Sequence, residues 1–310
     1  MTDRIHDLVI LGGGPAGYTA ALYAARSGMD VTVLEKLSAG GQMGLTAQID
    51  NYPGFPQGID GFTLGQQMQA GAERFGARTL LAEVTAARLT GPVKELETSE
   101  GLLKARAVVL ATGATPRHLG LAGEEALTGR GVNYCAACDG MFYKGKTVAV
   151  VGGGNSAVGD ALLLSRVAKE VILIHRRDTL RASSIYDKAL AEAENLTIRW
   201  NTVVTELLHD QRLTGLALKD TVTGETSTLS CDGVFVSVGR APSTELFRDQ
   251  VILDQAGYIQ ADETTRTNLP GVFAVGDVRT KPLRQVVTAV ADGAVAVHYA
   301  EEYLAQQPTP

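Results

Sequence analysis

A glycine-rich turn occurs twice in this chain, 140 residues apart, and each copy lies between an apolar run and a helical stretch. The first copy is residues 7–11 followed by residues 12–17 (GGGPAG), and the second is residues 147–151 followed by residues 152–157 (GGGNSA). A buried strand, a glycine turn and a helix form the dinucleotide-binding unit of parallel α/β folds. We therefore predict an α/β chain with two Rossmann-like, three-layer nucleotide-binding domains.

The glycines of the first copy each have a physical role. Gly12 allows the tight turn, Gly14 lets a pyrophosphate approach the backbone, and Gly17 lets the helix pack on the strand. The next predicted strand, residues 30–34, ends at Glu35. A carboxylate at this position can accept hydrogen bonds from a ribose and would repel a 2′-phosphate.

The second copy keeps Gly152 and Gly154 but has Ala157 in the third position, and the 140-residue shift carries Glu35 onto His175. Basic residues gather there, and they are His175, Arg176, Arg177 and Arg181. Guanidinium groups are suited to binding a 2′-phosphate. The second site is therefore predicted to prefer NADPH, with a solvated basic helix start as the alternative.

Similar segments close each copy and suggest a discontinuous organisation. Residues 108–116 resemble residues 234–242, and residues 269–277 form another predicted buried strand that ends in Gly-Asp. Asp277 can hydrogen-bond a polyol there or be an ordinary turn residue. We predict one domain from residues 1–116 and 244–310, into which residues 117–243 are inserted.

Composition excludes several classes of protein. A length of 310 residues predicts about two domains, and 45% hydrophobic with 20% charged residues is typical of a globular protein. The net charge of −6 is spread without a basic stripe, so nucleic acid is not expected as a partner. No apolar run reaches membrane-spanning length, and residues 1–7 lack a basic leader region, so we expect no membrane and a cytoplasmic location.

Two cysteines stand two residues apart in Cys135-Ala136-Ala137-Cys138, followed by Asp139. Such a pair in a reducing compartment is either redox-active or a metal ligand. A closed zinc site needs four ligands, and the chain has no second Cys-x-x-Cys, so we favour a redox dithiol and expect no metal. Cys231 is interpreted as a structural buried thiol.

The thiol pair needs a source of thiolate stabilisation. The nearest basic residues in the sequence are Arg130 and Lys144, so activation must come from a helix end, a cofactor or the fold. Asp139 is a candidate proton donor or acceptor.

Taken together, these motifs resemble the low-molecular-weight, bacterial-type thioredoxin reductases over nearly the whole chain. The motifs that carry the resemblance are residues 12–17, 40–42 (GGQ), 111–114 (ATGA), 135–140 (CAACDG), 152–157, 175–177 (HRR), 276–277 (GD) and 284–285 (RQ).

The resemblance implies FAD in the first domain, NADPH in the inserted domain, thioredoxin or a thioredoxin-like protein as partner, and a homodimer. The residues expected to hold FAD are Gly12, Gly14, Pro15, Ala16, Gly17, Glu35, Gly41, Gln42, Asn51, Val84, Thr112, Gly113, Asp277, Arg284, Gln285 and Val286. Those expected to hold NADPH are Gly152, Gly154, Asn155, Ser156, Ala157, His175, Arg176, Arg177 and Arg181.

The resemblance also implies the order of the chemistry. Hydride passes from NADPH to FAD, Cys138 lies against the flavin, Cys135 attacks the thioredoxin disulfide, and Asp139 protonates a departing thiolate. The inserted domain is expected to rotate between the two half-reactions. The Ala136-Ala137 pair departs from the Thr or Val that many relatives have second, which is expected only to tune the site.

Two alternatives remain open. A flavin-dependent dithiol oxidase of the same fold would keep the cysteines but would not need the arginines that follow His175. A non-catalytic nucleotide-binding redox sensor would not consume NADPH with thioredoxin.

Overall fold

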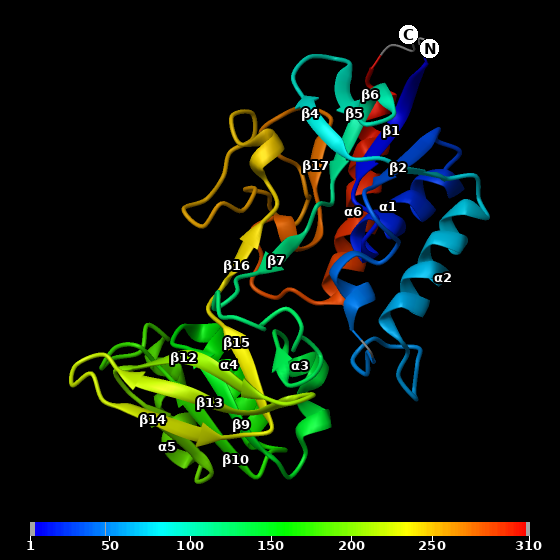
Figure 1. Cartoon of the computed structure of the whole chain (residues 1–310). Helices are drawn as coiled ribbons and strands as arrows, with labels where there is room; N and C mark the ends of the chain where they lie inside the picture. Colours follow the sequence, from blue (N-terminus) through cyan, green and yellow to red (C-terminus); the bar gives the residue numbers. More distant parts are fainter. Residues whose placement is uncertain (1–3, 47, 308–310) are drawn as a thin grey trace. The chain divides into compact units, whose positions relative to one another are not determined.

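The computed structural model describes residues 4–46 and 48–307. Residues 1–3, which belong to the segment expected to lack a basic leader region, lie outside the described residues. The chain divides into two compact units (Figure 1). The first comprises Met1–Thr115 and Ala241–Pro310, and the second is Pro116–Arg240. The sequence placed these boundaries after residues 116 and 243.

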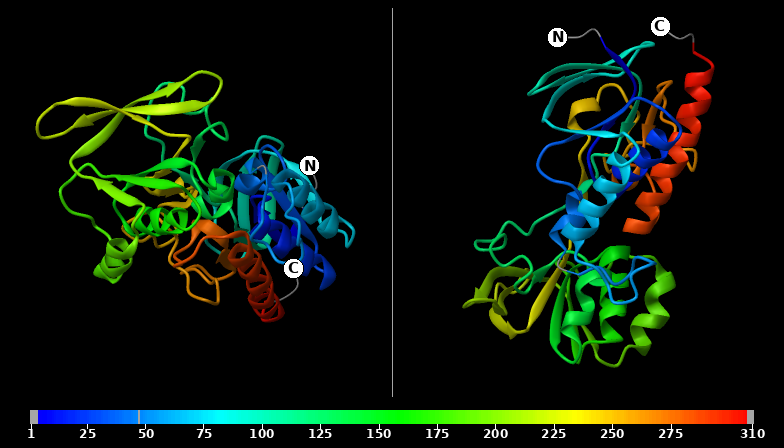
Figure 2. Two further views of the ribbon diagram at one scale, coloured as in Figure 1. Left: turned by 90° about the horizontal axis from the view of Figure 1, so that it is seen from below. Right: turned by 90° about the vertical axis from the view of Figure 1, so that its right-hand side faces the viewer.

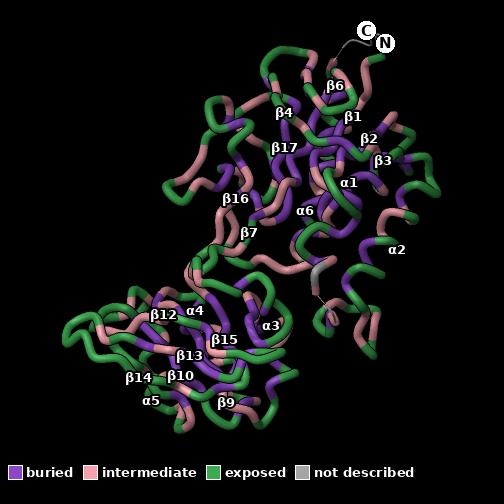
Figure 3. The backbone as a smooth tube through the Cα atoms, viewed as in Figure 1, coloured by how far each residue is buried: buried purple, intermediate pink, exposed green. Residues whose placement is uncertain are grey.

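The first unit is built on a seven-stranded sheet in which β1, β2, β3, β6 and β17 pair in parallel, while β4, β5 and β6 pair antiparallel. Strand β1 is buried along most of its length (Figure 3). The order is β3-β2-β1-β6-β5-β4, with β17 beside β6. The strands are β1 (Ile5–Leu11), β2 (Val31–Glu35), β3 (Arg78–Leu81), β4 (Val84–Arg88), β5 (Lys94–Thr98), β6 (Gly101–Leu110) and β17 (Val272–Ala274).

Successive side chains of β1 point to opposite faces of the sheet, and each face has its own hydrophobic core. Leu8 and Ile10 pack with the helices, whereas Val9 and Leu11 pack on the opposite face of the sheet. Helices α1 (Pro15–Arg26) and α6 (Val286–Ala305) lie side by side in every view (Figures 1 and 2).

Gly293 permits the close contact between α1 and α6, because a Cβ there would clash with the carbonyl oxygen of Ala16. Helix α2 (Gly61–Glu73) also packs on α1, and Asp60 caps it by accepting the Thr63 N–H at 2.8 Å. The short helical turns of this unit are η1 (Gly41–Leu45), η4 (Glu245–Phe247) and η5 (Gly276–Val278).

The second unit has a five-stranded, all-parallel sheet in the order β11-β10-β9-β15-β8 and a separate antiparallel sheet in the order β12-β13-β14. The parallel strands are β8 (Val132–Asn133), β9 (Thr147–Gly152), β10 (Glu170–Ile174), β11 (Leu196–Arg199) and β15 (Gly233–Ser237). The antiparallel strands are β12 (Thr202–His209), β13 (Leu213–Asp220) and β14 (Thr226–Ser230). The helices are α3 (Ala136–Asp139), α4 (Asn155–Ser165) and α5 (Asp187–Glu192), with the short turns η2 (Gly140–Tyr143) and η3 (Ser184–Tyr186).

Strand β9 shows why this unit has three layers. Val148 and Val150 pack with α4, whereas Ala149 and Val151 pack with the antiparallel sheet. Both units contain a parallel sheet in which the fingerprint strand is central and the next two strands follow on one side. The predicted α/β fold is confirmed.

The two chain crossings between the units pair with each other. Strands β7 (Ala114–Pro116) and β16 (Arg240–Pro242) form a two-stranded sheet. Within residues 4–46 and 48–307, no helix combines the length and the apolar character that crossing a bilayer requires.

Candidate functional site

The first glycine turn has the geometry of a phosphate cradle. Gly12 has φ +107°, and a Cβ there would lie 2.5 Å from the carbonyl oxygen of Ala111. A Cβ at Gly17 would clash with the carbonyl oxygen of Gly12, whereas nothing lies within 4 Å of the corresponding position at Gly14. Helix α1 begins at Pro15 without a side-chain cap, so its first N–H groups face this open space and fit a diphosphate.

Glu35 supports the same turn from the end of β2. Its carboxylate accepts the N–H of Gly13 at 2.7 Å and that of Leu37 at 3.0 Å. Each carboxylate oxygen has a second lone pair, so a ribose hydroxyl can still be accepted.

The loop that carries Gly41 and Gln42 lies against the turn. The Gly40 N–H donates to the Gly13 carbonyl oxygen at 2.8 Å, and a Cβ on Gly41 would lie 3.5 Å from the Gly14 Cα. Val84 is near the end of β2, because Ala82, two residues earlier, donates its N–H to the Glu35 carbonyl oxygen at 2.9 Å.

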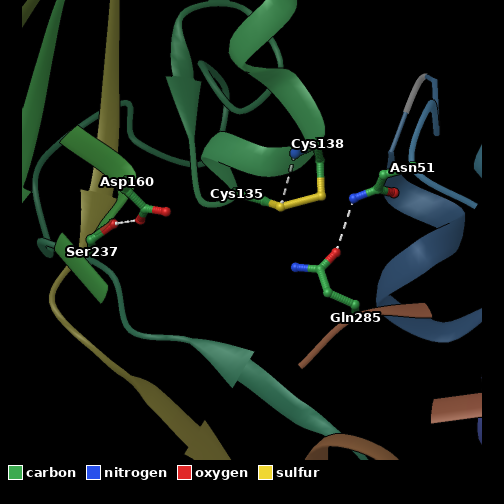
Figure 4. Close-up of a disulfide and its surroundings, with 6 residues drawn as sticks. All are labelled: Asn51, Cys135, Cys138, Asp160, Ser237 and Gln285. Carbon is green, nitrogen blue, oxygen red and sulfur yellow. Dashed lines mark hydrogen bonds between the residues drawn. A yellow bond between two sulfur atoms is a disulfide. The ribbon is translucent and has the colours of Figure 1, made fainter. Parts of the chain in front are cut away.

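Further predicted FAD residues meet at the start of α6. The Asn51 amide donates to the Gln285 side-chain oxygen at 3.0 Å (Figure 4), and Gln285 is the N-cap that precedes Val286. Arg284 donates to the carbonyl oxygen of Asp277 at 3.4 Å and lies 3.9 Å from the ring centre of Tyr258.

Thr112 and Gly113 follow β6, and the Thr112 hydroxyl donates to the Ser243 carbonyl oxygen at 2.7 Å. This bond ties the segment before the first crossing to the segment after the second. The assignment of these side chains to FAD stays a prediction.

The second glycine turn repeats the first. Nothing lies within 4 Å of a Cβ position at Gly154, and α4 begins at Asn155 without a side-chain cap. Ser156 is exposed in the first turn of α4. Residue 157 is alanine, where the first turn has a glycine. Its methyl group leaves no room for a side chain at Gly152, because a Cβ there would lie only 2.6 Å away.

The arginine segment folds back on this turn. The Arg181 N–H donates to the Gly153 carbonyl oxygen at 2.7 Å, and the Ser183 N–H donates to Asn155 Oδ1 at 2.8 Å. Arg176, Arg177 and Arg181 are exposed, and their guanidinium groups form no ion pair with any residue that the structure describes. Three cations beside an open helix N-terminus fit a phosphorylated ribose.

His175 differs from the arginines that follow it. Only 4% of this residue is exposed, its Nε2 lies 2.9 Å from the Thr179 carbonyl oxygen, and a Cβ on Gly153 would clash with its ring. The sequence grouped His175 with the basic side chains that bind the nucleotide. Its ring instead packs beneath the glycine turn and supports the arginine segment, because the end of β10 points this side chain into the core.

Cys135 and Cys138 are joined in a disulfide, with 5.3 Å between their Cα atoms (Figure 4). Cys135 is the N-cap of α3, and its sulfur accepts the Cys138 N–H at 3.2 Å. Both cysteines are half-buried, and Ala137 between them is exposed. The fold thus supplies a helix end at Cys135, which is one of the three sources of thiolate stabilisation expected from the sequence.

Asp139 follows Cys138 directly and is the last residue of α3. Burial raises the pKa of its carboxyl group to about 6. A carboxyl group with a pKa this close to neutral can donate or accept a proton, and Asp139 is the residue after Cys138 in the sequence.

The second unit also contains a third cysteine and an exposed apolar pair that follows the disulfide segment. Cys231 is buried and free, as expected, and burial raises the pKa of its thiol to about 12, so its structural role stays a prediction. Met141 and Phe142, directly after the disulfide segment, are 57% and 46% exposed.

Asp160 is a half-buried acidic residue of the second unit that the motifs in the sequence did not indicate. This residue lies on α4, one turn after Ala157, and accepts a hydrogen bond from the Ser237 hydroxyl (Figure 4). Burial raises the pKa of its carboxyl group, although the Ser237 bond opposes the shift. The sequence does contain a signal for this residue, because Asp160 is the one acidic residue in a helical segment that otherwise has buried Ala, Val and Leu.

The comparisons with known proteins agree with this geometry. The family model for pyridine nucleotide-disulphide oxidoreductases matches residues 6–293. A thioredoxin reductase from Mycolicibacterium smegmatis is 48% identical over 307 residues, which is 99% of each chain.

Two solved structures show the same likeness. The crystal structure of thioredoxin reductase from Streptococcus pyogenes has a TM-score of 0.89 at 40% identity and covers 99% of this chain and 100% of that one. The Lactococcus lactis thioredoxin reductase in its FR conformation has a TM-score of 0.71 at 41% identity, with 97% and 100% covered.

Proposed function

The chain belongs to the pyridine nucleotide-disulphide oxidoreductase family, among the thioredoxin reductases, and from this membership we propose that it is an NADPH-dependent thioredoxin-disulfide reductase that uses FAD. The observation that carries the proposal is the Cys135–Cys138 disulfide at the start of α3, in the same unit as a glycine turn flanked by arginines.

The first glycine turn, Glu35 and the residues at the start of α6 would hold FAD. Bound flavin supplies the two-electron chemistry that connects a nicotinamide hydride to a disulfide. The open position at Gly14 and the uncapped N-terminus of α1 fit its diphosphate. Glu35 fits a ribose that carries no 2′-phosphate.

NADPH is the proposed hydride donor. Arg176, Arg177 and Arg181 lie in one exposed segment that Arg181 ties to the second glycine turn through its backbone N–H, whereas the first turn has the Glu35 carboxylate. A 2′-phosphate would be attracted at the second site and repelled at the first, because the charge of the side chains is reversed. The reversal supports NADPH over NADH as the reductant and disfavours an oxidase that needs no nicotinamide.

The thiol chemistry follows from the positions of the two sulfurs. In the reduced pair, the Cys138 N–H and the end of α3 stabilise a Cys135 thiolate, and exposed Ala137 leaves its approach open. This thiolate attacks the partner disulfide, a Cys135–partner bond forms, and one partner sulfur leaves as a thiolate. Cys138 then attacks Cys135, which restores the Cys135–Cys138 bond and releases the second partner thiolate.

Two electrons and two protons reach the partner in this exchange. Asp139, with its pKa raised to about 6, is the proposed source of a proton for a departing thiolate. Met141 and Phe142 give the disulfide an exposed apolar border, which fits a protein partner better than a small disulfide.

The same dithiol must be reduced in one step and meet a protein in the next. We propose that the second unit rotates as a body between these steps, with the paired crossings β7 and β16 as the pivot. A homodimer is part of the same proposal, and light scattering on the purified protein checks it.

The decisive experiment measures NADPH oxidation by the purified protein with oxidised thioredoxin. We expect turnover with NADPH, little with NADH, and none in Cys135→Ser. Cys231→Ser is the matched control and should retain full activity, because that thiol is buried and takes no part in the disulfide.

Activity retained in Cys135→Ser would refute the role of that sulfur. Oxygen consumption that does not depend on NADPH would support a dithiol oxidase instead. The absence of NADPH consumption with thioredoxin would support a redox sensor.

A further inference from the structure

A buried cluster of charges lies beneath the Gly276–Asp277 turn in the first unit. The Asp292 carboxylate accepts hydrogen bonds from Arg279 at 2.8 and 2.9 Å and from Lys281 at 2.7 Å. The three side chains are 7%, 3% and 4% exposed, respectively. Two cations therefore share one carboxylate inside the protein.

The carboxylate also holds the backbone of the turn. Asp292 Oδ2 accepts the N–H of Gly276 at 2.8 Å. Gly276 has φ +71°, and a Cβ there would lie 3.1 Å from the Ala16 Cβ of the first glycine turn. Gly293, the next residue after Asp292, is the position at which α6 meets the Ala16 carbonyl oxygen.

The cluster reaches other residues predicted to hold FAD. The Arg279 carbonyl oxygen accepts a hydrogen bond from Arg284 at 3.2 Å, and Arg284 also donates to the Asp277 carbonyl oxygen. Lys281 donates to the Thr288 carbonyl oxygen at 3.1 Å, in the first turn of α6. Asp292 thus connects the fingerprint helix, the Gly-Asp turn and the start of α6.

A buried ion pair is weak evidence for stability, because desolvation of the charges offsets most of their attraction. A more specific role is to determine one conformation of the backbone around it. We propose that Asp292, Arg279 and Lys281 are positioning residues that hold the Gly276–Asp277 turn in the conformation that binds FAD, and so determine how tightly the flavin is held. This inference rests on the proposed function.

The experiment measures how fast FAD leaves the purified, flavin-loaded protein, from the rise of flavin fluorescence on dilution. In Asp292→Ala the Gly276 N–H loses its acceptor and two buried cations lose their carboxylate, so we expect release at least about tenfold faster. Lys281→Met keeps the Arg279–Asp292 pair and should increase release by about threefold.

Asp30→Ala is the matched control within the same unit. Asp30 also binds several basic residues, with Arg4 at 2.9 Å and His6 at 3.1 Å, but it lies just before β2, at the amino end of the parallel strands. Ligands of such sheets bind at the carboxyl ends. Asp30→Ala should lower the unfolding temperature and change FAD release by less than about twofold.

Equal release rates from Asp292→Ala and the wild type, or equal increases in Asp292→Ala and Asp30→Ala, would overturn the inference. If Asp292→Ala does not fold, Lys281→Met decides, and an unchanged release rate there overturns the inference. A wild-type protein that contains no FAD and acquires none would instead refute the proposed function.

Discussion

Asp139 shows how one residue acquires its chemistry from its surroundings. An aspartate in water has lost its proton at neutral pH, but burial raises the pKa of Asp139 to about 6. The folded protein therefore binds this proton more tightly than the unfolded chain does. The contribution of Asp139 to stability is present at low pH and is lost as the pH rises through about 6.

Asp139→Asn should consequently stabilise the protein at about pH 8 and much less at about pH 4. The shift of about two pKa units corresponds to at most about 3 kcal/mol of unfolding free energy. The measurement is the unfolding temperature of variant and wild type across this pH range. A difference in unfolding temperature that does not change with pH would contradict the raised pKa. The variant is also expected to reduce thioredoxin more slowly.

The exposed arginines lead to a second prediction at the residue scale. Replacing Arg176 and Arg177 together by Ala should increase the KM for NADPH by at least about 100-fold, because each charge-assisted hydrogen bond to a phosphate contributes about 1.5–3 kcal/mol. The KM for NADH should change little. Trp200, the single tryptophan, lies edge-on to His175, so its fluorescence gives an independent measure of nucleotide binding.

Arg212→Ala, an exposed arginine at the turn between β12 and β13, is the control and should leave both KM values unchanged. An equal increase in the KM for NADPH and the KM for NADH in the double variant would show that the arginines do not bind the 2′-phosphate.

At the scale of elements, α3 and η2 place a reactive and an apolar surface next to each other. Helix α3 carries the disulfide on its first turn, and η2 follows at once with exposed Met141 and Phe142. Gly140 joins the two elements and packs against α4, where a Cβ would lie 3.1 Å from Leu164. The proposed partner-binding surface is therefore positioned by the same helix that follows the second glycine turn.

Phe142→Ala should increase the KM for thioredoxin by about tenfold, because burying a phenylalanine contributes about 1.5–3 kcal/mol. Reduction of a small aromatic disulfide should be unaffected, since that substrate needs no apolar border. Steady-state kinetics with both substrates checks the prediction.

Phe62→Ala, which removes a 50% exposed phenylalanine from α2 in the other unit, is the matched control. A similar increase in the KM for thioredoxin in both variants would show that Phe142 does not bind the partner. A similar loss of activity with both substrates in Phe142→Ala would show the same.

At the scale of the whole molecule, the chain passes twice between two compact units, and the two crossing segments pair with each other. Gly239 precedes β16 with φ +114°, and its carbonyl oxygen accepts the Arg117 N–H at 2.9 Å. A left-handed glycine next to a crossing is a position where a small backbone change moves a whole unit.

Gly239→Ala should slow multiple-turnover thioredoxin reduction by about tenfold, because alanine is strained at this φ by about 1–2 kcal/mol. Nucleotide affinity, measured by Trp200 fluorescence, should not change. Gly224→Ala, at φ +78° in the turn between β13 and β14, is the control and should retain activity. Equal rates in the two variants would contradict a pivot at this crossing.

Much of the fold was predictable from short segments. The glycine turns, their strands and the start of their helices follow from local backbone requirements, and the observed α1 and α4 begin next to Gly14 and Gly154 as expected. The antiparallel β4–β5 pair and the β12-β13-β14 sheet were not predicted, because their strands alternate weakly and are partly exposed.

The sequence by itself determined the places where the backbone must turn tightly, the spacing that allows Cys135 and Cys138 to pair, and the change from Glu35 to a basic segment. These are properties of a few neighbouring residues. The tertiary structure decided the burial of Asp139, the position of the His175 ring beneath Gly153, and the charges gathered around Asp292. Burial and pairing depend on contacts between residues far apart in the chain, so they exist only once the units have folded.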